Sequence, residues 1–173
     1  IGYEPYEIEP TTTLPEDFKE FWDNELAKAA KVPMLTRVEY VAEQSDDKVD
    51  VYNVRVQSYK RGNYIYGVLS VPKSEGKKAA ILRLPGAAVR SFSGPNSLAY
   101  EGFIVFEIGV HGIPVDHDPE MYRALSSGPL GGYATIGLED KNTFYYKRVY
   151  LGCVRAIDYL CSREDVDSER IAG

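Results

Sequence analysis

The sequence predicts an α/β fold with an antiparallel start, followed by parallel strands with flanking helices. Residues 78–84 (KAAILRL) form a short apolar run that stops at Pro85-Gly86, and the small residues Ala87 and Ala88 follow. An aliphatic strand ending in such a turn is typical of open α/β sheets, which place their chemistry at the carboxyl ends of their strands. Before this run the sequence predicts a hairpin, and after it strands alternate with helices.

The composition is that of an ordinary globular protein with an acidic balance. The 173 residues carry a formal charge of −6, and 44% of them are hydrophobic. This charge and the lack of a basic cluster argue against nucleic acid as a partner. No apolar segment approaches the roughly 20 residues that span a bilayer, so we expect no membrane partner. The sequence leaves open whether the protein is cytoplasmic, periplasmic or secreted.

The first part of the chain predicts a linker, one helix and three strands. Residues 1–14 are expected to be a linker from an upstream region, with Thr13 as a candidate cap and Pro15 in the first helical turn. The helix over residues 16–31 carries an apolar face around Trp22, which we expect to dock on the domain. The expected strands cover residues 36–42, 49–59 and 63–71, and the turn at 60–63 joins the last two as an antiparallel hairpin.

The second part of the chain predicts alternating strands and helices around one long loop. Residues 109–142 show little regular pattern, and a loop of that length is usually functional or covers a site. The other expected elements are a short helix or turn at 94–100, a buried strand at 103–108, a long helix at 143–162 and a strand that starts at Ile171.

A family resemblance rests on six segments taken in order: LPEDFKEFW, YIYGVLSVP, LRLPGAAVR, GVHGIP, FYYKRVYLGCVRAIDYL and DVDSERIAG. From Leu14 onward the sequence resembles the amino-terminal portion of the acetyl xylan esterase and cephalosporin-C deacetylase family of α/β-hydrolases. The resemblance implies a serine carbohydrate esterase that removes acetyl groups from acetylated xylan or sugars, and such proteins tend to form homo-oligomers. We expect no cofactor and no metal, because adjacent loop residues such as Asp116, His117 and Asp118 rarely converge on one ion.

The resemblance also implies which parts of an esterase lie outside this sequence. The family's serine sits on a G-x-S-x-G elbow after the strand that follows the long helix, and the 173 residues contain no such motif. We therefore expect residues 15–173 to be an incomplete hydrolase domain that ends before the elbow and is inactive alone. Its partners would be the remaining carboxyl-terminal half and an acetylated oligosaccharide or small acetyl ester. Two alternatives stay open, an inactive carbohydrate-binding or assembly module and a hydrolase for another substrate.

The turn after residues 78–84 is the first candidate site. The resemblance implies that one of the two oxyanion donors lies there, and it matches the backbone N–H of Ala87. Family members often have tyrosine at this position, so alanine changes the side-chain wall but leaves the N–H. The other interpretation is a tight turn that needs small residues for packing.

Three further residues are candidates for the substrate pocket, namely Gly86, His111 and Tyr133. The family's general base follows its nucleophile in sequence, so we expect His111 to be structural or pocket-lining. Tyr133, like Tyr122, is a candidate to stack on a sugar ring. The resemblance also implies that an aromatic and basic cluster, residues 145–148, helps to hold the long loop and the start of the helix.

Overall fold

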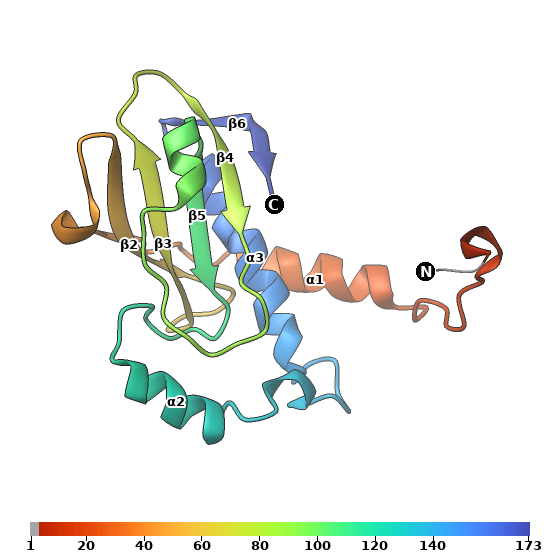
Figure 1. The fold of residues 1–173 in the computed structure, drawn as a ribbon. Coiled ribbons are helices and arrows are strands. Elements are labelled where there is room, and N and C mark those ends of the chain that lie inside the picture. Colours follow the sequence, from red (N-terminus) through yellow and green to blue (C-terminus); the bar gives the residue numbers. More distant parts are fainter. Residues whose placement is uncertain (1–3) are drawn as a thin grey trace.

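A six-stranded mixed sheet forms the centre of the computed structural model, which describes residues 4–173 (Figure 1). The strands are β1 (Arg37–Tyr40), β2 (Val49–Gln57), β3 (Tyr64–Pro72), β4 (Lys78–Arg83), β5 (Ile104–Gly109) and β6 (Val166–Ala172). Their order across the sheet is β1-β2-β3-β5-β4-β6. The pairs β1–β2, β2–β3 and β3–β5 are antiparallel, whereas β4 pairs parallel with β5 and β6. The predicted antiparallel start and parallel continuation are confirmed.

The β2–β3 hairpin forms where the sequence predicts it. The Ser58 N–H donates to the Asn63 carbonyl at 2.7 Å, and Gly62 supplies the positive φ of 75° that the turn needs. Gly67 of β3 lies beside β5, where an added Cβ would collide with the Glu107 carbonyl and the Phe106 ring. A side chain at this position would therefore push the two central strands apart.

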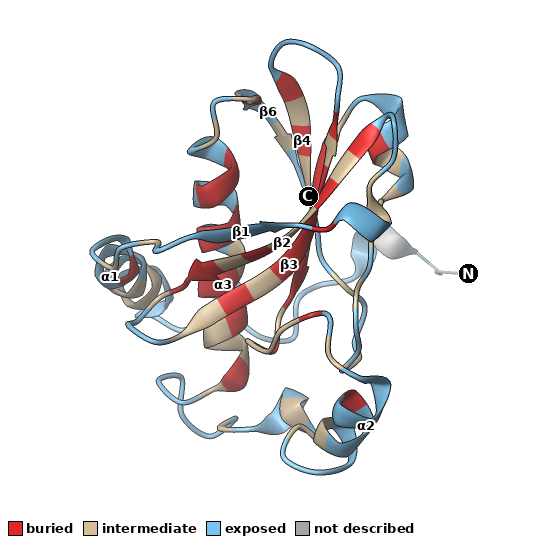
Figure 2. Cartoon of the chain, turned by 90° about the vertical axis from the view of Figure 1, so that its left-hand side faces the viewer, coloured by how far each residue is buried: buried red, intermediate tan, exposed pale blue. Residues whose placement is uncertain are grey.

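Side chains of β2 alternate between two core layers on the two faces of the sheet. Val49 and Val51 belong to the layer under the short 3-10 helix at Ser97–Glu101, and Val54 and Val56 belong to the layer under helix α3 (Tyr145–Cys161). Figure 2 shows buried residues along the strands and on the side of α3 that faces them. The period of two expected for an extended strand buried on both faces is thus observed.

Helix α3 is amphipathic and lies across one face of the sheet. Ala156 and Leu160 are fully buried, and the Tyr159 ring packs edge to face on Phe106 with 5.3 Å between centroids. Ile157, the next residue after Ala156, is 40% exposed. The reason is geometric, because the next residue after Ala156 points about 100° away from the buried stripe.

Helix α1 (Phe18–Ala30) docks on the outer side of α3. The Trp22 ring meets Tyr150 at 5.7 Å, which confirms the expected docking face. Buried Arg155 of α3 donates to the carbonyls of Ala29 and Val32, so one guanidinium satisfies acceptors at the end of α1. The helix begins later than Thr13 and Pro15 suggest, and its N-cap residue Asp17 makes no side-chain cap bond.

The long loop expected at residues 109–142 is partly helical. It contains α2 (Pro119–Ser127) and a 3-10 turn at Tyr133–Thr135. Asp118 caps α2 by accepting from the Glu120 N–H, and proline occupies the first helical turn, a start signal that the Gly and Pro content of the loop obscured. The last strand, β6, begins at Val166 rather than Ile171.

Residues 4–14 extend away from the sheet (Figure 1), and residues 6–14 are exposed. Residues 1–3 of the expected linker lie outside the described residues, and the role of the segment as a linker stays a prediction. Within the part of the chain described, no helix is both long enough and apolar enough to cross a membrane.

The Arg155 contacts predict a local weakening when they are removed. Arg155→Met removes one of the donors to the Ala29 carbonyl, which still accepts from the Val32 N–H, and the side-chain donor to the half-buried Val32 carbonyl. We therefore expect the free energy of unfolding to fall by about 1–2 kcal/mol. Hydrogen exchange in α1 should rise more than exchange in β5. The control Arg123→Met removes an exposed arginine of α2 that pairs only with Glu120, and it should change stability by less than about 0.5 kcal/mol. Equal effects of the two substitutions in denaturant unfolding would contradict this assignment.

Candidate functional site

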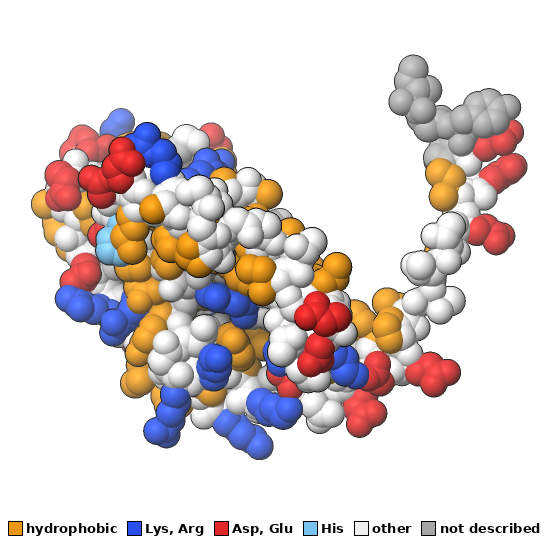
Figure 3. Space-filling model, turned by 90° about the horizontal axis from the view of Figure 1, so that it is seen from below, with side chains coloured by type: hydrophobic (Ala, Val, Ile, Leu, Met, Phe, Trp, Pro, Cys, Tyr) orange, Lys and Arg blue, Asp and Glu red, His pale blue; other side chains and the backbone are white. Residues whose placement is uncertain are grey.

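The candidate site lies at the edge of the sheet where β4 and β5 both end. These strands run parallel, with Leu82 opposite Phe106 and Arg83 opposite Glu107, so the loops that follow them leave the sheet on the same side. The first turn of α3 and the whole of α2 also lie at this edge (Figure 1). Figure 3 views the edge from below and shows hydrophobic side chains exposed between groups of charged ones.

The turn after β4 presents an unused backbone donor to solvent. Gly86 and Ala87 are exposed, and among the described residues no acceptor bonds the Ala87 N–H. Beside the turn is a cavity of about 370 Å³. It is lined by residues 87–89, by Ser126 and Leu130, by residues 132–134 and by Tyr146. The backbone after β4 therefore faces a space large enough for a small acyl group and part of a sugar.

His111 lies behind this cavity and connects three segments of the chain. The residue is only 7% exposed. Nε2 lies 3.0 Å from the Ala88 carbonyl oxygen, and Nδ1 lies 2.7 Å from the Tyr145 hydroxyl. The ring of Tyr133 packs edge to face against it, with 4.6 Å between centroids. His111 thus contacts the turn after β4, the 3-10 turn and the start of α3 at once.

The backbone around His111 is held by the same helix. Arg148 of α3 donates to the His111 carbonyl at 2.7 Å, and its guanidinium lies 5.1 Å from the centre of the Tyr145 ring. Gly112 has a φ of 67°, and an added Cβ would collide with the Arg148 guanidinium. Glycine is therefore required for both the backbone conformation and the space that Arg148 fills.

Tyrosines form the wall of the cavity opposite the turn. Tyr133 lies 5.4 Å from Tyr145 and 6.4 Å from Tyr146, measured between ring centroids. Burial raises the pKa of the Tyr145 and Tyr133 hydroxyls above 10.0, so both are protonated at neutral pH. Of these tyrosines, Tyr133 and Tyr146 line the cavity, and aromatic rings there suit contact with the face of a sugar.

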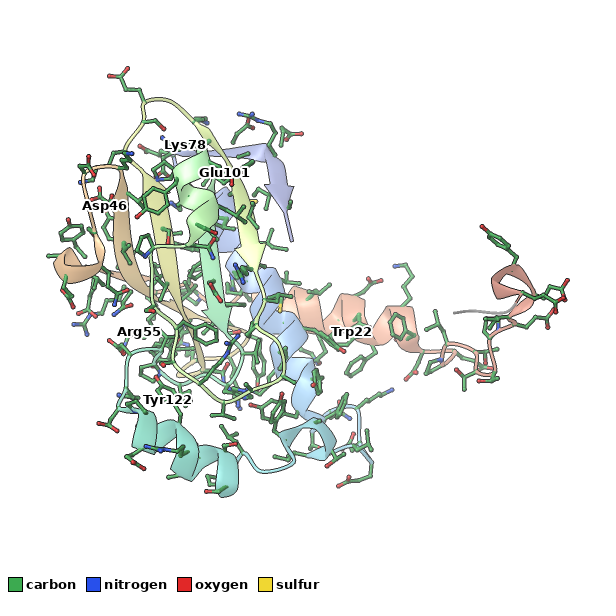
Figure 4. All side chains as sticks on the ribbon, viewed as in Figure 1. Trp22, Asp46, Arg55, Lys78, Glu101 and Tyr122 are labelled. Atoms are coloured by element: carbon green, nitrogen blue, oxygen red, sulfur yellow. The ribbon has the colours of Figure 1, made fainter. Side chains whose placement is uncertain are left out.

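The structure brings together two of the four predicted site residues at the cavity surface. Ala87 and Tyr133 line it, His111 lies behind Tyr133, and Gly86 lies in the same turn outside the lining. Tyr122 does not fit the expected sugar-stacking role, because it is 3% exposed and its hydroxyl donates to Pro114 and accepts from the His117 N–H (Figure 4). Through these hydrogen bonds, Tyr122 links α2 to the loop after β5.

Sequence reasoning missed the residues that complete the arrangement. No local pattern marks the Ala88 carbonyl as the acceptor of a histidine 23 positions away. The space for Arg148 over Gly112 depends equally on tertiary structure, although a His-Gly pair directly after a buried strand could have indicated a constrained turn. The cluster at residues 145–148 does hold the start of α3 to the loops, as the Tyr145 and Arg148 bonds show.

A metal centre is not evident in the part of the chain that the structure describes. No three His, Cys, Asp or Glu side chains gather there in a way that could hold an ion. In the acidic loop after β5, Asp116 accepts from Asn53 at 3.0 Å and Asp118 caps α2.

Comparison with known proteins assigns the family. The profile described as acetyl xylan esterase (AXE1) matches residues 4–173. The chain belongs to the acetyl xylan esterase family. It is 34% identical over 176 residues to acetyl esterase Axe7A of Xylanibacter ruminicola, covering 99% of this chain but 40% of that protein.

Solved structures agree with this assignment. The acetyl xylan esterase from Paenibacillus sp. R4 is 30% identical with a TM-score of 0.77, and the match covers 95% of this chain and 53% of that one. Acetyl xylan esterase 1 from Thermoanaerobacterium sp. has the same fold at 24% identity, with a TM-score of 0.76 and coverage of 93% and 50%. The chain thus spans about half the length, or less, of these esterases.

The burial of His111 in this acetyl xylan esterase family member predicts a pH-dependent stability. Burial, with the nearby Arg148 charge, lowers the pKa of the imidazole below its ordinary 6.5, although the Ala88 carbonyl opposes this. The unfolded chain therefore binds the proton more tightly, and stability falls as pH drops through 6.5 toward the lower folded pKa. Urea unfolding between pH 7.5 and 5 should show this loss. His111→Gln should remove it and His117→Gln should keep it, and an unchanged pH profile in His111→Gln would contradict the assignment.

The Arg148 contact predicts a strong effect of Gly112→Ala. The added methyl would displace the Arg148 guanidinium, lie 3.0 Å from the Tyr64 carbonyl oxygen and place alanine at positive φ, so we expect a loss of about 2 kcal/mol in the free energy of unfolding. Gly76→Ala is the matched control, because its φ of 80° is similar but no atom lies within 4 Å of an added Cβ. It should cost about 1 kcal/mol. A Gly112 effect no larger than the Gly76 effect would show that the Arg148 contact adds nothing.

Proposed function

We propose that this chain is the amino-terminal part of a serine carbohydrate esterase that removes acetyl groups from acetylated xylan or related oligosaccharides. The observation that carries the proposal is the family match over residues 4–173, which runs through every element of the candidate site. The names of the 34% identical relative and the 30% identical structure agree with acetyl ester hydrolysis.

In the proposed reaction, this chain stabilises the negative charge that develops on the acetyl carbonyl oxygen. A serine oxygen attacks the acetyl carbonyl, the carbonyl electrons move to its oxygen, and a tetrahedral oxyanion forms. When the tetrahedral intermediate collapses, the bond to the sugar oxygen breaks, and that oxygen takes up the proton that the serine had given to a histidine base. In a second step, water attacks the acetyl-serine and releases acetate. The exposed Ala87 N–H in the turn after β4 would donate to the oxyanion, and the second N–H would follow the serine.

The cavity beside Ala87 suits the two parts of such a substrate. The small alanine side chain leaves space for an acetyl methyl group next to the donor. Tyr133 and Tyr146 form the aromatic side of the same cavity and would pack on the sugar ring. In this arrangement Gly86 keeps the approach to the donor open, because it has no side chain and no atom lies within 4 Å of the place a Cβ would take.

The remaining catalytic groups would come from the carboxyl-terminal half of the enzyme. The 173 residues contain no G-x-S-x-G motif, and we propose that the serine, its histidine and aspartate, and the second donor lie outside them. In the described sheet, β6 pairs with β4 alone. Its free edge is where further strands would add.

Two measurements test the proposed activity. The complete gene product that contains this chain should react with a fluorophosphonate serine probe and release acetate from acetylated xylo-oligosaccharides. The 173-residue chain alone should do neither, because it lacks the nucleophile. A complete product that binds xylo-oligosaccharides but neither reacts with the probe nor releases acetate would favour a catalytically inactive binding module.

Removal of the Ala87 N–H tests the donor. In the complete gene product, Ala87→Pro should lower kcat by about 10²–10³-fold, the cost of losing one oxyanion donor, while KM changes little. Ala87→Gly keeps the N–H and should retain kcat within about fivefold. Equal kcat values for the two variants, with both folded by circular dichroism, would refute the role of Ala87.

A further inference from the structure

We propose that His111 is a positioning residue that holds the turn after β4 so that the Ala87 N–H points at the reacting carbonyl. This inference rests on the proposed esterase function. It concerns a side chain that would touch neither substrate nor the reacting atoms.

The turn depends on His111 because it has no other hydrogen bond. Across residues 85–91, the structure of residues 4–173 shows no backbone–backbone hydrogen bond, and the His111 bond to Ala88 is the one side-chain bond made to the segment. An exposed segment without ladder or turn bonds samples many conformations. Anchoring the carbonyl one residue after the donor restricts the peptide that carries the Ala87 N–H.

The partners of the ring determine its tautomer. The Ala88 carbonyl only accepts, so Nε2 must carry a proton. In the neutral ring Nδ1 is then an acceptor, and the Tyr145 hydroxyl, protonated at neutral pH, donates to it. Both nitrogens are therefore used for structure. With 7% of the residue exposed and Tyr133 packed on the ring, His111 is not available as a general base.

The anchor is rigid because His111 is itself held at two points by α3. Tyr145 bonds its ring and Arg148 bonds its carbonyl, and both residues belong to the first turn of a helix packed in the core. A continuous set of bonds therefore leads from the helix through the imidazole to the turn. The groups around the imidazole are the Tyr145 hydroxyl, the Tyr133 ring and the positive charge of Arg148.

Two substitutions separate the bond to Ala88 from the rest of the side chain. In His111→Gln the amide nitrogen reaches the place of Nε2 and can still donate to the Ala88 carbonyl. In His111→Asn the shorter amide ends near the place of Nδ1 and cannot reach it. In the complete gene product with 4-nitrophenyl acetate, we expect Asn to lower kcat about 10–100-fold, less than loss of the donor itself, with KM within about twofold. Gln should restore most of the rate.

Hydrogen exchange gives a readout that does not depend on activity. His111→Asn should speed amide exchange in a peptide covering residues 84–92 and leave β5 and α3 unchanged, whereas His111→Gln should not. If His111→Asn fails to fold, Tyr145→Phe, which removes the donor to Nδ1 and keeps the aromatic ring, should show the same selective increase. Unchanged exchange in the folded variants would overturn the inference even if the complete protein proved to have no esterase activity. Wild-type kcat in His111→Asn of an active enzyme would overturn it as well.

Discussion

The packing of α3 on the sheet is the interaction on which the other parts of the structure depend. Its inner face buries Ala156, Tyr159 and Leu160 against the strands, and burial of a leucine side chain such as Leu160 stabilises the fold by about 1.5–3 kcal/mol. Its outer face receives α1 through Arg155 and Tyr150. One amphipathic helix thus contacts the core through its inner face, the first helix through its outer face and the candidate site through its first turn.

The position of α3 also explains how an exposed turn can be ordered. The first helical turn lies at the edge where β4 and β5 end, and its Tyr145 and Arg148 are fixed by the helix that the core holds. Hydrogen bonds connect the core-packed helix to the loop after β5, and a further hydrogen bond connects that loop to the loop after β4. The same geometry forms the cavity wall, since Tyr146 follows Tyr145 in the helix and its ring packs near the ring of Tyr133. Functional loops on a rigid scaffold are built in this way.

Much of the fold was predictable because local patterns agree with the tertiary structure. The alternation in residues 49–57 and the Gly62 turn are sufficient for the hairpin, and the apolar run before Pro85 marks β4. Prediction failed for α2, whose short helix is surrounded by glycine and proline, and for the first half of β6, where the polar stretch at 167–170 hides an edge strand. At the site, the family resemblance predicts the role of Ala87, and Tyr133 is a candidate as an aromatic residue of the long loop. Both line one cavity, and their roles stay predictions. The bonds of His111 join three distant segments, so no local signal could reveal them.

The central claim is that the core-held helix fixes the turn after β4 so that its backbone stabilises an oxyanion. The most direct measurement is a crystal structure of the complete gene product after reaction with a phosphonate that mimics the tetrahedral intermediate. We expect the Ala87 nitrogen to lie about 2.7–3.1 Å from the anionic oxygen, with the bond from His111 to Ala88 intact. An oxygen bound by other donors, with the Ala87 N–H directed elsewhere, would contradict it.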